Sequence, residues 1–173
     1  MLEPDFTGLA AARVAVVGLG LMGGSLALAL RGHCAELVGV EPDAPAAALA
    51  CERGVVDRTA SLAEATACDL LVLAAPVRAI LALLAELRRL PPPAQTVAVL
   101  DLGSTKREVV AAMQLLPAPY DPIGGHPMCG KEVSGLAHAE AGLFRERVFV
   151  LTPLERTSSA GQNLARTDRK SVV

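Results

Sequence analysis

The chain has 173 residues and a formal net charge of −2, a length that suits one domain of ordinary size and a charge that gives no basic footprint for nucleic acid or anionic lipid. Hydrophobic residues make up 52% of the chain and aromatic residues 2%, so we expect a core of Ala, Val and Leu, as in α/β proteins with close helix-to-strand contacts. The expected partners are a small molecule or another protein subunit, not nucleic acid or a membrane.

The stretch from Arg13 to Gly32 predicts a buried strand, Val14–Val17, followed by a glycine-rich turn and a helix over roughly Met22–Leu30. The turn has the spacing G-x-G-x-x-G, in which the glycines allow a tight turn, a close approach of the backbone to a pyrophosphate and close packing of helix on strand. The helix would direct its unpaired N–H groups at the phosphates. The predicted cofactor-binding residues of this turn are Gly18, Gly20, Leu21, Met22 and Gly23.

An apolar run behind Arg13 could also belong to a signal peptide or a membrane span. Glu3 and Asp5 are acidic where a signal needs positive charge, and the glycines between Gly18 and Gly24 are poor material for a spanning helix. The four cysteines, which contain no C-x-x-C pair, fit a reduced cytoplasmic protein without a metal site. They are Cys34, Cys51, Cys68 and Cys129.

A second strand, Glu36–Val40, ends at Glu41, about 20 residues beyond the turn, where a dinucleotide-binding fold places the acid that holds the adenosine ribose. A carboxylate there repels a 2′-phosphate, and no Arg or Lys follows before Arg53, so NAD is favoured over NADP. A solvated charge at a strand end is the alternative for Glu41.

Strands and helices alternate through the rest of the chain. Because open α/β sheets bind ligands outside the carboxyl ends of their strands, Ala75, Pro76 and Val77 are predicted to line the nucleotide cleft. The predicted helices are 44–53, a short one at Ser61 with capping-box spacing to Glu64, 77–90 and 107–116; the predicted strands are 55–56, 69–75, 96–100 and 149–152.

These elements predict a single α/β domain of the Rossmann type, a doubly wound and mostly parallel sheet over residues 1–153. Residues 154–173 are polar and lack apolar periodicity, which predicts a mobile tail. Residues 123–143 form the least repetitive stretch and are expected to be a loop.

Two segments that follow predicted strands could share one cleft, and they carry the candidate catalytic residues. His126, between Gly125 and Pro127, could abstract a hydroxyl proton near pH 7. Ser104 could orient the imidazole or the reacting hydroxyl, or could simply cap the next helix. Lys106 could attract a substrate carboxylate or be solvated, and Glu132 could be a gate at the mouth of the site or an exposed charge. His33 and His138 have no comparable context.

Together these motifs resemble the prephenate and arogenate dehydrogenases of tyrosine biosynthesis. The resemblance covers roughly residues 12–153. The combination of the motifs at 101–106 and 124–135 is the part that is specific to this family. The matching segments are GLGLMGGSL at 18–26, DLGSTK at 101–106, GGHPMCGKEVSG at 124–135, LF at 143–144 and VLTP at 150–153.

The resemblance implies oxidative decarboxylation of prephenate to 4-hydroxyphenylpyruvate, or of arogenate to tyrosine, with hydride passing to NAD. It also implies that His126 is the catalytic histidine that assists deprotonation of the ring hydroxyl, that Ser104 acts beside it, and that Glu132 lies near the entrance. Family members continue into a helical domain that makes a homodimer and supplies cationic groups for the substrate's carboxylates, and this sequence has no matching continuation. The alternatives are a 3-hydroxyacid-type dehydrogenase, against which the GGHP segment argues, and a dinucleotide-binding module without turnover.

Overall fold

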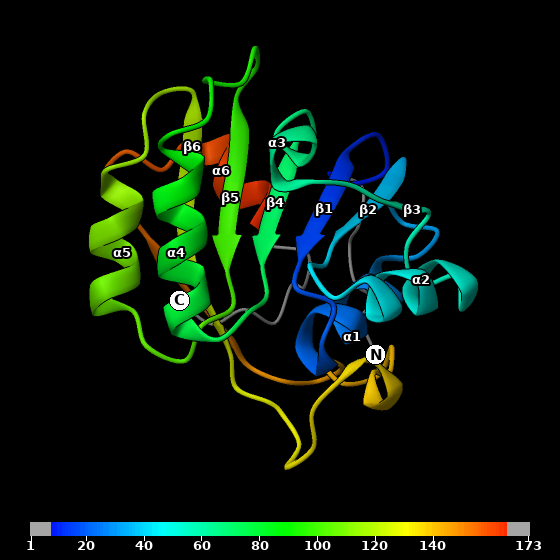
Figure 1. Ribbon diagram of the computed structural model, residues 1–173. Helices are drawn as coiled ribbons and strands as arrows, with labels where there is room; N and C mark the ends of the chain where they lie inside the picture. The colour runs from blue at the N-terminus through cyan, green and yellow to red at the C-terminus, as the bar shows by residue number, and fades with distance from the viewer. Residues whose placement is uncertain (1–7, 166–173) are drawn as a thin grey trace.

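The computed structural model describes residues 8–165, which form a seven-stranded sheet in the order β3-β2-β1-β4-β5-β6-β7 with helices on both faces (Figure 1). Strands β1 to β6 are parallel to their neighbours, and β7 is antiparallel to β6. The elements in chain order are β1 (Arg13–Val17), α1 (Leu21–Leu30), β2 (Glu36–Val40), α2 (Ala44–Glu52), β3 (Arg58–Thr59), α3 (Leu62–Ala65), β4 (Leu70–Leu73), α4 (Val77–Leu87), β5 (Val97–Asp101), α5 (Arg107–Gln114), β6 (Tyr120–Pro127), η1 (Leu136–His138), β7 (Phe149–Pro153) and α6 (Ser159–Ala165).

The core consists of two apolar layers, one on each face of the sheet. Side chains of a strand alternate between faces, so Val14 and Val16 of β1 join the layer with α1 and α2, while Ala15 and Val17 join the layer with α3, α4 and α5. Strands covered on both faces are buried throughout, as β4 and β5 are. The expected Rossmann-type, mostly parallel sheet is confirmed.

The strand order reverses between β1 and β4, because the chain first winds outward through β2 and β3 and then returns to the other side of β1. In such sheets the ligand crevice lies at this switch point, outside the carboxyl ends of the strands. In Figure 1 the arrowheads of β1, β4 and β5 point to the bottom of the view, where α1 and the yellow segment with η1 also lie. The predicted site residues follow these strand ends.

Two expectations about the sheet are wrong. Residues 55–56 do not form the third strand: Val55 and Val56 are buried in the core, and the chain pairs with β2 only at Arg58–Thr59. The second error concerns His126, which lies in strand β6 and not in a loop. Proline and glycine within 120–127 hide this strand from sequence patterns, but β5 and β7 supply partners on its two sides.

The structure also differs from the tail expected from residue 154. Arg156 donates to the main-chain oxygens of Leu116 and Tyr120, Thr157 donates to that of Pro122, and the Ser158 amide donates to the Asp121 carboxylate. The helix α6 follows. The domain therefore extends at least to residue 165, and the remainder of the expected tail, 166–173, lies outside the described residues. Within residues 8–165 no helix is both long and apolar enough to cross a bilayer.

Candidate functional site

The glycine-rich turn has the geometry of a phosphate-binding loop. Gly18 has a φ of +92°, which favours glycine, and a methyl group on Gly23 would overlap the carbonyl oxygen of Gly18. At Gly20, by contrast, an added methyl would meet no described atom within 4 Å. Gly20 is also the N-cap of α1, and no described side chain caps that helix end. The turn thus leaves open space in front of the first amides of α1, as a bound pyrophosphate requires.

Glu41 lies at the end of β2, half-buried, and its carboxylate faces the glycine-rich turn. One oxygen accepts a hydrogen bond from the Leu19 amide at 2.8 Å, and the other accepts from the Asp43 amide at 3.1 Å. Each carboxylate oxygen can accept a further bond, so these contacts leave room for ribose hydroxyl groups. The solvated-charge alternative does not describe Glu41, because its side chain holds the turn in place.

The predicted cleft residues after β4 lie at the same edge of the sheet. The Ala74 amide donates to the Val17 carbonyl, which ties this segment to the start of the glycine-rich turn. Pro76 is the N-cap of α4 and Val77 is its first residue, while Ala75 is half-buried beside them. A methyl group on Gly103 would lie 3.4 Å from Val77, so the segments after β4 and β5 are in contact.

His126 is half-buried at the carboxyl end of β6, paired with Val150 of β7. Four parallel strands, β1, β4, β5 and β6, end at this edge, so three strand spacings, roughly 14 Å, separate the glycine-rich turn from the histidine strand. A dinucleotide whose pyrophosphate lies on α1 would extend across β4 toward this histidine.

Asp101, at the end of β5, is completely buried and is a feature that sequence reasoning missed. Its carboxylate pairs with the Lys106 ammonium and accepts hydrogen bonds from the amides of Gly103, at 2.9 Å, and Gly125, at 3.1 Å. Lys106 is therefore paired within the protein, and its predicted attraction for a substrate carboxylate stays a prediction. The sequence signal that could have indicated this pair is an acid at the end of an apolar strand with a lysine five positions later.

The other candidates occupy exposed positions after β5 and β6. Ser104 is exposed and is not the cap of α5, whose N-cap is Lys106, with no capping side chain among the described residues. Glu132 is also exposed, next to Lys131, which forms a 2.7 Å ion pair with Glu140. Among the described residues neither Ser104 nor Glu132 forms a hydrogen bond with His126, so their roles at the site stay predictions.

The segment after β6 is docked on α1, the helix of the glycine-rich turn. Ser25 of α1 is fully buried, and its hydroxyl accepts a hydrogen bond of 3.0 Å from the Glu140 amide. A methyl group on Gly24 would lie 2.6 Å from Leu136 and 2.9 Å from Ala139. Gly24 and Ser25 therefore pack α1 against the segment that follows Lys131 and Glu132.

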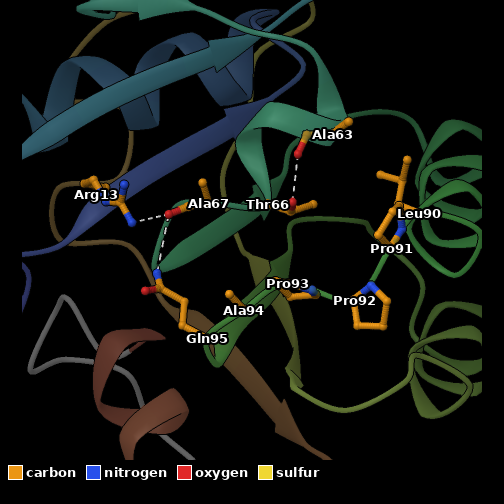
Figure 2. Close-up of a pocket in the computed structure, with 10 residues that line it drawn as sticks. All are labelled: Arg13, Ala63, Thr66, Ala67, Leu90, Pro91, Pro92, Pro93, Ala94 and Gln95. Atoms are coloured by element: carbon orange, nitrogen blue, oxygen red, sulfur yellow. Dashed lines mark hydrogen bonds between the residues drawn. The ribbon is translucent and has the colours of Figure 1, made fainter.

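A surface pocket of about 420 Å³ lies at the opposite, amino end of the strands (Figure 2). It is lined mainly by Ala and Pro side chains, with Arg13, Thr66 and Gln95 as polar members. Arg13 begins β1 and Gln95 precedes β5, so this pocket is remote from the glycine-rich turn. Its Arg13 already binds the Ala67 carbonyl.

Within residues 8–165, which include all four cysteines, no disulfide forms and no group of three His, Cys, Asp or Glu is arranged to hold a metal ion. Burial raises the pKa of the Cys34, Cys68 and Cys129 thiols.

Comparison with known proteins matches residues 26–167 to the family described as prephenate dehydrogenase, nucleotide-binding domain. A prephenate dehydrogenase of Bacillus subtilis is 36% identical over 149 residues, which are 83% of this chain and 40% of the relative. The crystal structure of Synechocystis arogenate dehydrogenase is similar with a TM-score of 0.80 and 35% identity, over 90% of this chain and 55% of that one. An Aquifex aeolicus prephenate dehydrogenase in complex with hydroxyphenyl propionate and NAD+ gives a TM-score of 0.79 and 28% identity, over 91% of this chain and 56% of the other. The chain thus spans less than half the length of the curated relative.

Proposed function

The chain belongs to the prephenate dehydrogenase family and carries its nucleotide-binding domain, and from this premise we propose that it binds NAD and, within a complete enzyme, serves the oxidative decarboxylation of prephenate or arogenate. The observation that carries the proposal is the common edge of the sheet: an open, uncapped glycine-rich turn and a half-buried histidine lie at the ends of strands β1 and β6. The Aquifex relative was crystallised with NAD+.

The residues of this chain fit a dinucleotide. The first amides of α1 would hold the pyrophosphate at the open face of Gly20, and Glu41 would accept from the adenosine ribose while keeping its bond to Leu19. The same carboxylate would repel the 2′-phosphate of NADP. Ala75, Pro76 and Val77 would line the cleft between the two nucleosides.

Bound NAD supplies a hydride acceptor. In the proposed reaction the substrate's ring carbon that bears the hydroxyl group loses a hydride, the hydroxyl loses its proton, and the ring becomes aromatic as its carboxylate leaves as carbon dioxide. His126 accepts the hydroxyl proton as a neutral imidazole, a role typically worth about 10² to 10⁴ in rate. Ser104 orients that hydroxyl, and Glu132 stands at the mouth of the cleft.

A second candidate is a dinucleotide-binding module without turnover. The chain spans 40% of its Bacillus relative, so turnover by the whole enzyme is a proposal that has to be tested separately from NAD binding. The four unpaired cysteines support a reducing compartment such as the cytoplasm for either candidate.

The test combines two measurements on the same protein. Titration with NAD should show saturable binding, and NADH formation should appear with prephenate or arogenate when the protein is assayed with the remainder of the enzyme. His126→Asn should abolish NADH formation and leave the Kd for NAD nearly unchanged. Equal loss of binding and turnover would contradict the assignment of His126, and binding without turnover in every assembly would favour the second candidate.

A further inference from the structure

We infer that Asp101 and Lys106 are positioning residues that fix the strand carrying His126, through the hydrogen bond from the Gly125 amide to Asp101. The importance of this contact for catalysis rests on the proposed function, but the contact itself is a property of the fold. Neither residue needs to touch the substrate.

The first step concerns the register of β6. Its parallel ladder with β5 ends at the pair Leu100–Ile123. Beyond this point β6 continues beside the edge strand β7, where Gly125 faces Leu151 and His126 faces Val150. On the β5 side, the Asp101 side chain takes over by accepting the Gly125 amide at 3.1 Å. It thereby holds the residue next to His126.

The second step concerns packing around Gly125. A methyl group there would lie 2.7 Å from the Asp101 carbonyl oxygen and 2.8 Å from both Leu100 and Phe149. The strand is therefore enclosed by β5 on one side and by the aromatic ring of β7 on another. Position 125 thus has no room for a side chain, and the Asp101 carboxylate supplies the polar contact of the Gly125 amide within this tightly packed segment.

The third step concerns charge. Asp101 is 0% exposed, and a buried carboxylate needs a cation and hydrogen-bond donors. Lys106, whose side chain is 19% exposed, supplies the cation, and its stem passes Gly124, where an added methyl would lie 3.3 Å from Lys106. The lysine thus stabilises the acid that holds Gly125.

The test uses the 173-residue chain labelled with ¹⁵N and ¹³C, with Asp101→Asn as the main variant. Asparagine has almost the same shape but a single acceptor oxygen. Lys106 and the Gly103 amide both approach the oxygen of Asp101 that does not hold Gly125, so the new amide nitrogen would face the Gly125 N–H, donor against donor. The matched control is Asp121→Asn, which alters another buried carboxylate, near the amino end of β6 itself, where Asp121 accepts from the Ser158 amide.

Asp101→Asn should accelerate hydrogen exchange at Gly125 by about ten- to hundredfold relative to the Val99 amide of the same variant. It should also shift the ring resonance of His126, identified by its loss in His126→Asn. Asp121→Asn should leave both readouts as in the original chain, even where it lowers the melting temperature. If Asp101→Asn does not fold, Lys106→Gln should move both readouts in the same direction by a few-fold.

Unchanged Gly125 exchange and an unchanged His126 resonance in a folded Asp101→Asn or Lys106→Gln protein would overturn the inference. An equal effect of Asp121→Asn would also overturn it, because β6 would then be loosened as a whole. A chain that fails to bind NAD would contradict the proposed function but would leave these readouts intact.

Discussion

Two glycines three positions apart in the same turn should respond in opposite ways to the same added methyl group. Gly20→Ala should leave the fold intact and abolish tight NAD binding, whereas Gly23→Ala should destabilise the fold itself. The reason is visible in their surroundings: no described atom lies within 4 Å of a methyl on Gly20, while a methyl on Gly23 overlaps the Gly18 carbonyl oxygen and lies 3.0 Å from the Ala74 side chain.

The magnitudes follow from these contacts. Gly20 has a φ of −71°, which alanine adopts without strain, so its stability should change by less than about 1 kcal/mol, or about 2–4 °C in Tm. A methyl in the pyrophosphate position should remove at least one charge-assisted hydrogen bond, worth about 1.5–3 kcal/mol, so NAD should bind roughly ten- to hundredfold more weakly. Overpacking at Gly23 should lower stability by about 1–3 kcal/mol, or about 2–12 °C in Tm.

The assay is thermal unfolding of each variant with and without NAD, together with calorimetric titration. The Tm of the original chain should rise when NAD is added. Without NAD, Gly20→Ala should have nearly the same Tm as the original chain, but adding NAD should raise it little. Wild-type NAD affinity in Gly20→Ala would refute the placement of the pyrophosphate at this turn. An unchanged Tm in Gly23→Ala would refute the packing argument for the helix.

Four further predictions concern other residues. Glu41→Gln leaves one acceptor oxygen for the amides of Leu19 and Asp43, so NAD should bind about tenfold more weakly. It also removes the charge that would repel a 2′-phosphate, so the preference for NAD over NADP should shrink. An unchanged ratio of the two Kd values would contradict this prediction. Ser25→Ala removes the acceptor for the Glu140 amide, so it should lower stability by about 1–3 kcal/mol and speed tryptic cleavage after Lys131. The control Ser104→Ala, at an exposed position, should change neither stability nor cleavage. Because burial raises the pKa of the Cys34, Cys68 and Cys129 thiols from an ordinary value of 9.0 and the thiolate is the nucleophile, iodoacetamide should modify the exposed Cys51 first, as mass spectrometry would show. The unfolded chain releases those thiol protons at lower pH than the folded one, so the contribution of these three thiols to stability should be constant below about pH 9 and fall above it; a rise in Tm above pH 9 would contradict the shifts.

The glycine-rich half of the domain was predictable from sequence because its signals are local. A β-branched run, a glycine-rich turn and a following helix are contiguous, and Glu41 comes at the end of the next apolar run. The structure adds that Glu41 bonds to Leu19, a contact between residues 22 positions apart. The position of Glu41 at the strand end was enough to predict it as a cofactor-binding residue, but its hydrogen bond with Leu19 could not be predicted from the sequence.

The second half was harder because its contacts are distant in sequence. Strand β6 contains Pro122, Gly124 and Gly125, which have weak strand preference, and it is a strand because β5 and β7 pair with it. Ser25 and Glu140 are 115 positions apart, and no periodicity connects them. Asp101 begins the motif DLGSTK, yet its hydrogen bond with the Gly125 amide depends on β6, a neighbouring strand that was not predicted from the sequence.

Arg156 joins the end of α5 to a much later part of the chain. The carbonyl groups of Gln114 and Leu116, at the end of α5, accept hydrogen bonds from a guanidinium that comes 42 and 40 positions later in the chain. During synthesis on the ribosome these carbonyls must bind water until Arg156 has emerged, whereas β1 to β4 have all their mutual partners by Leu73. All sheet partners of β1, β2 and β3 are therefore synthesised before Arg156, whereas the contacts on the side with His126 are complete only after it.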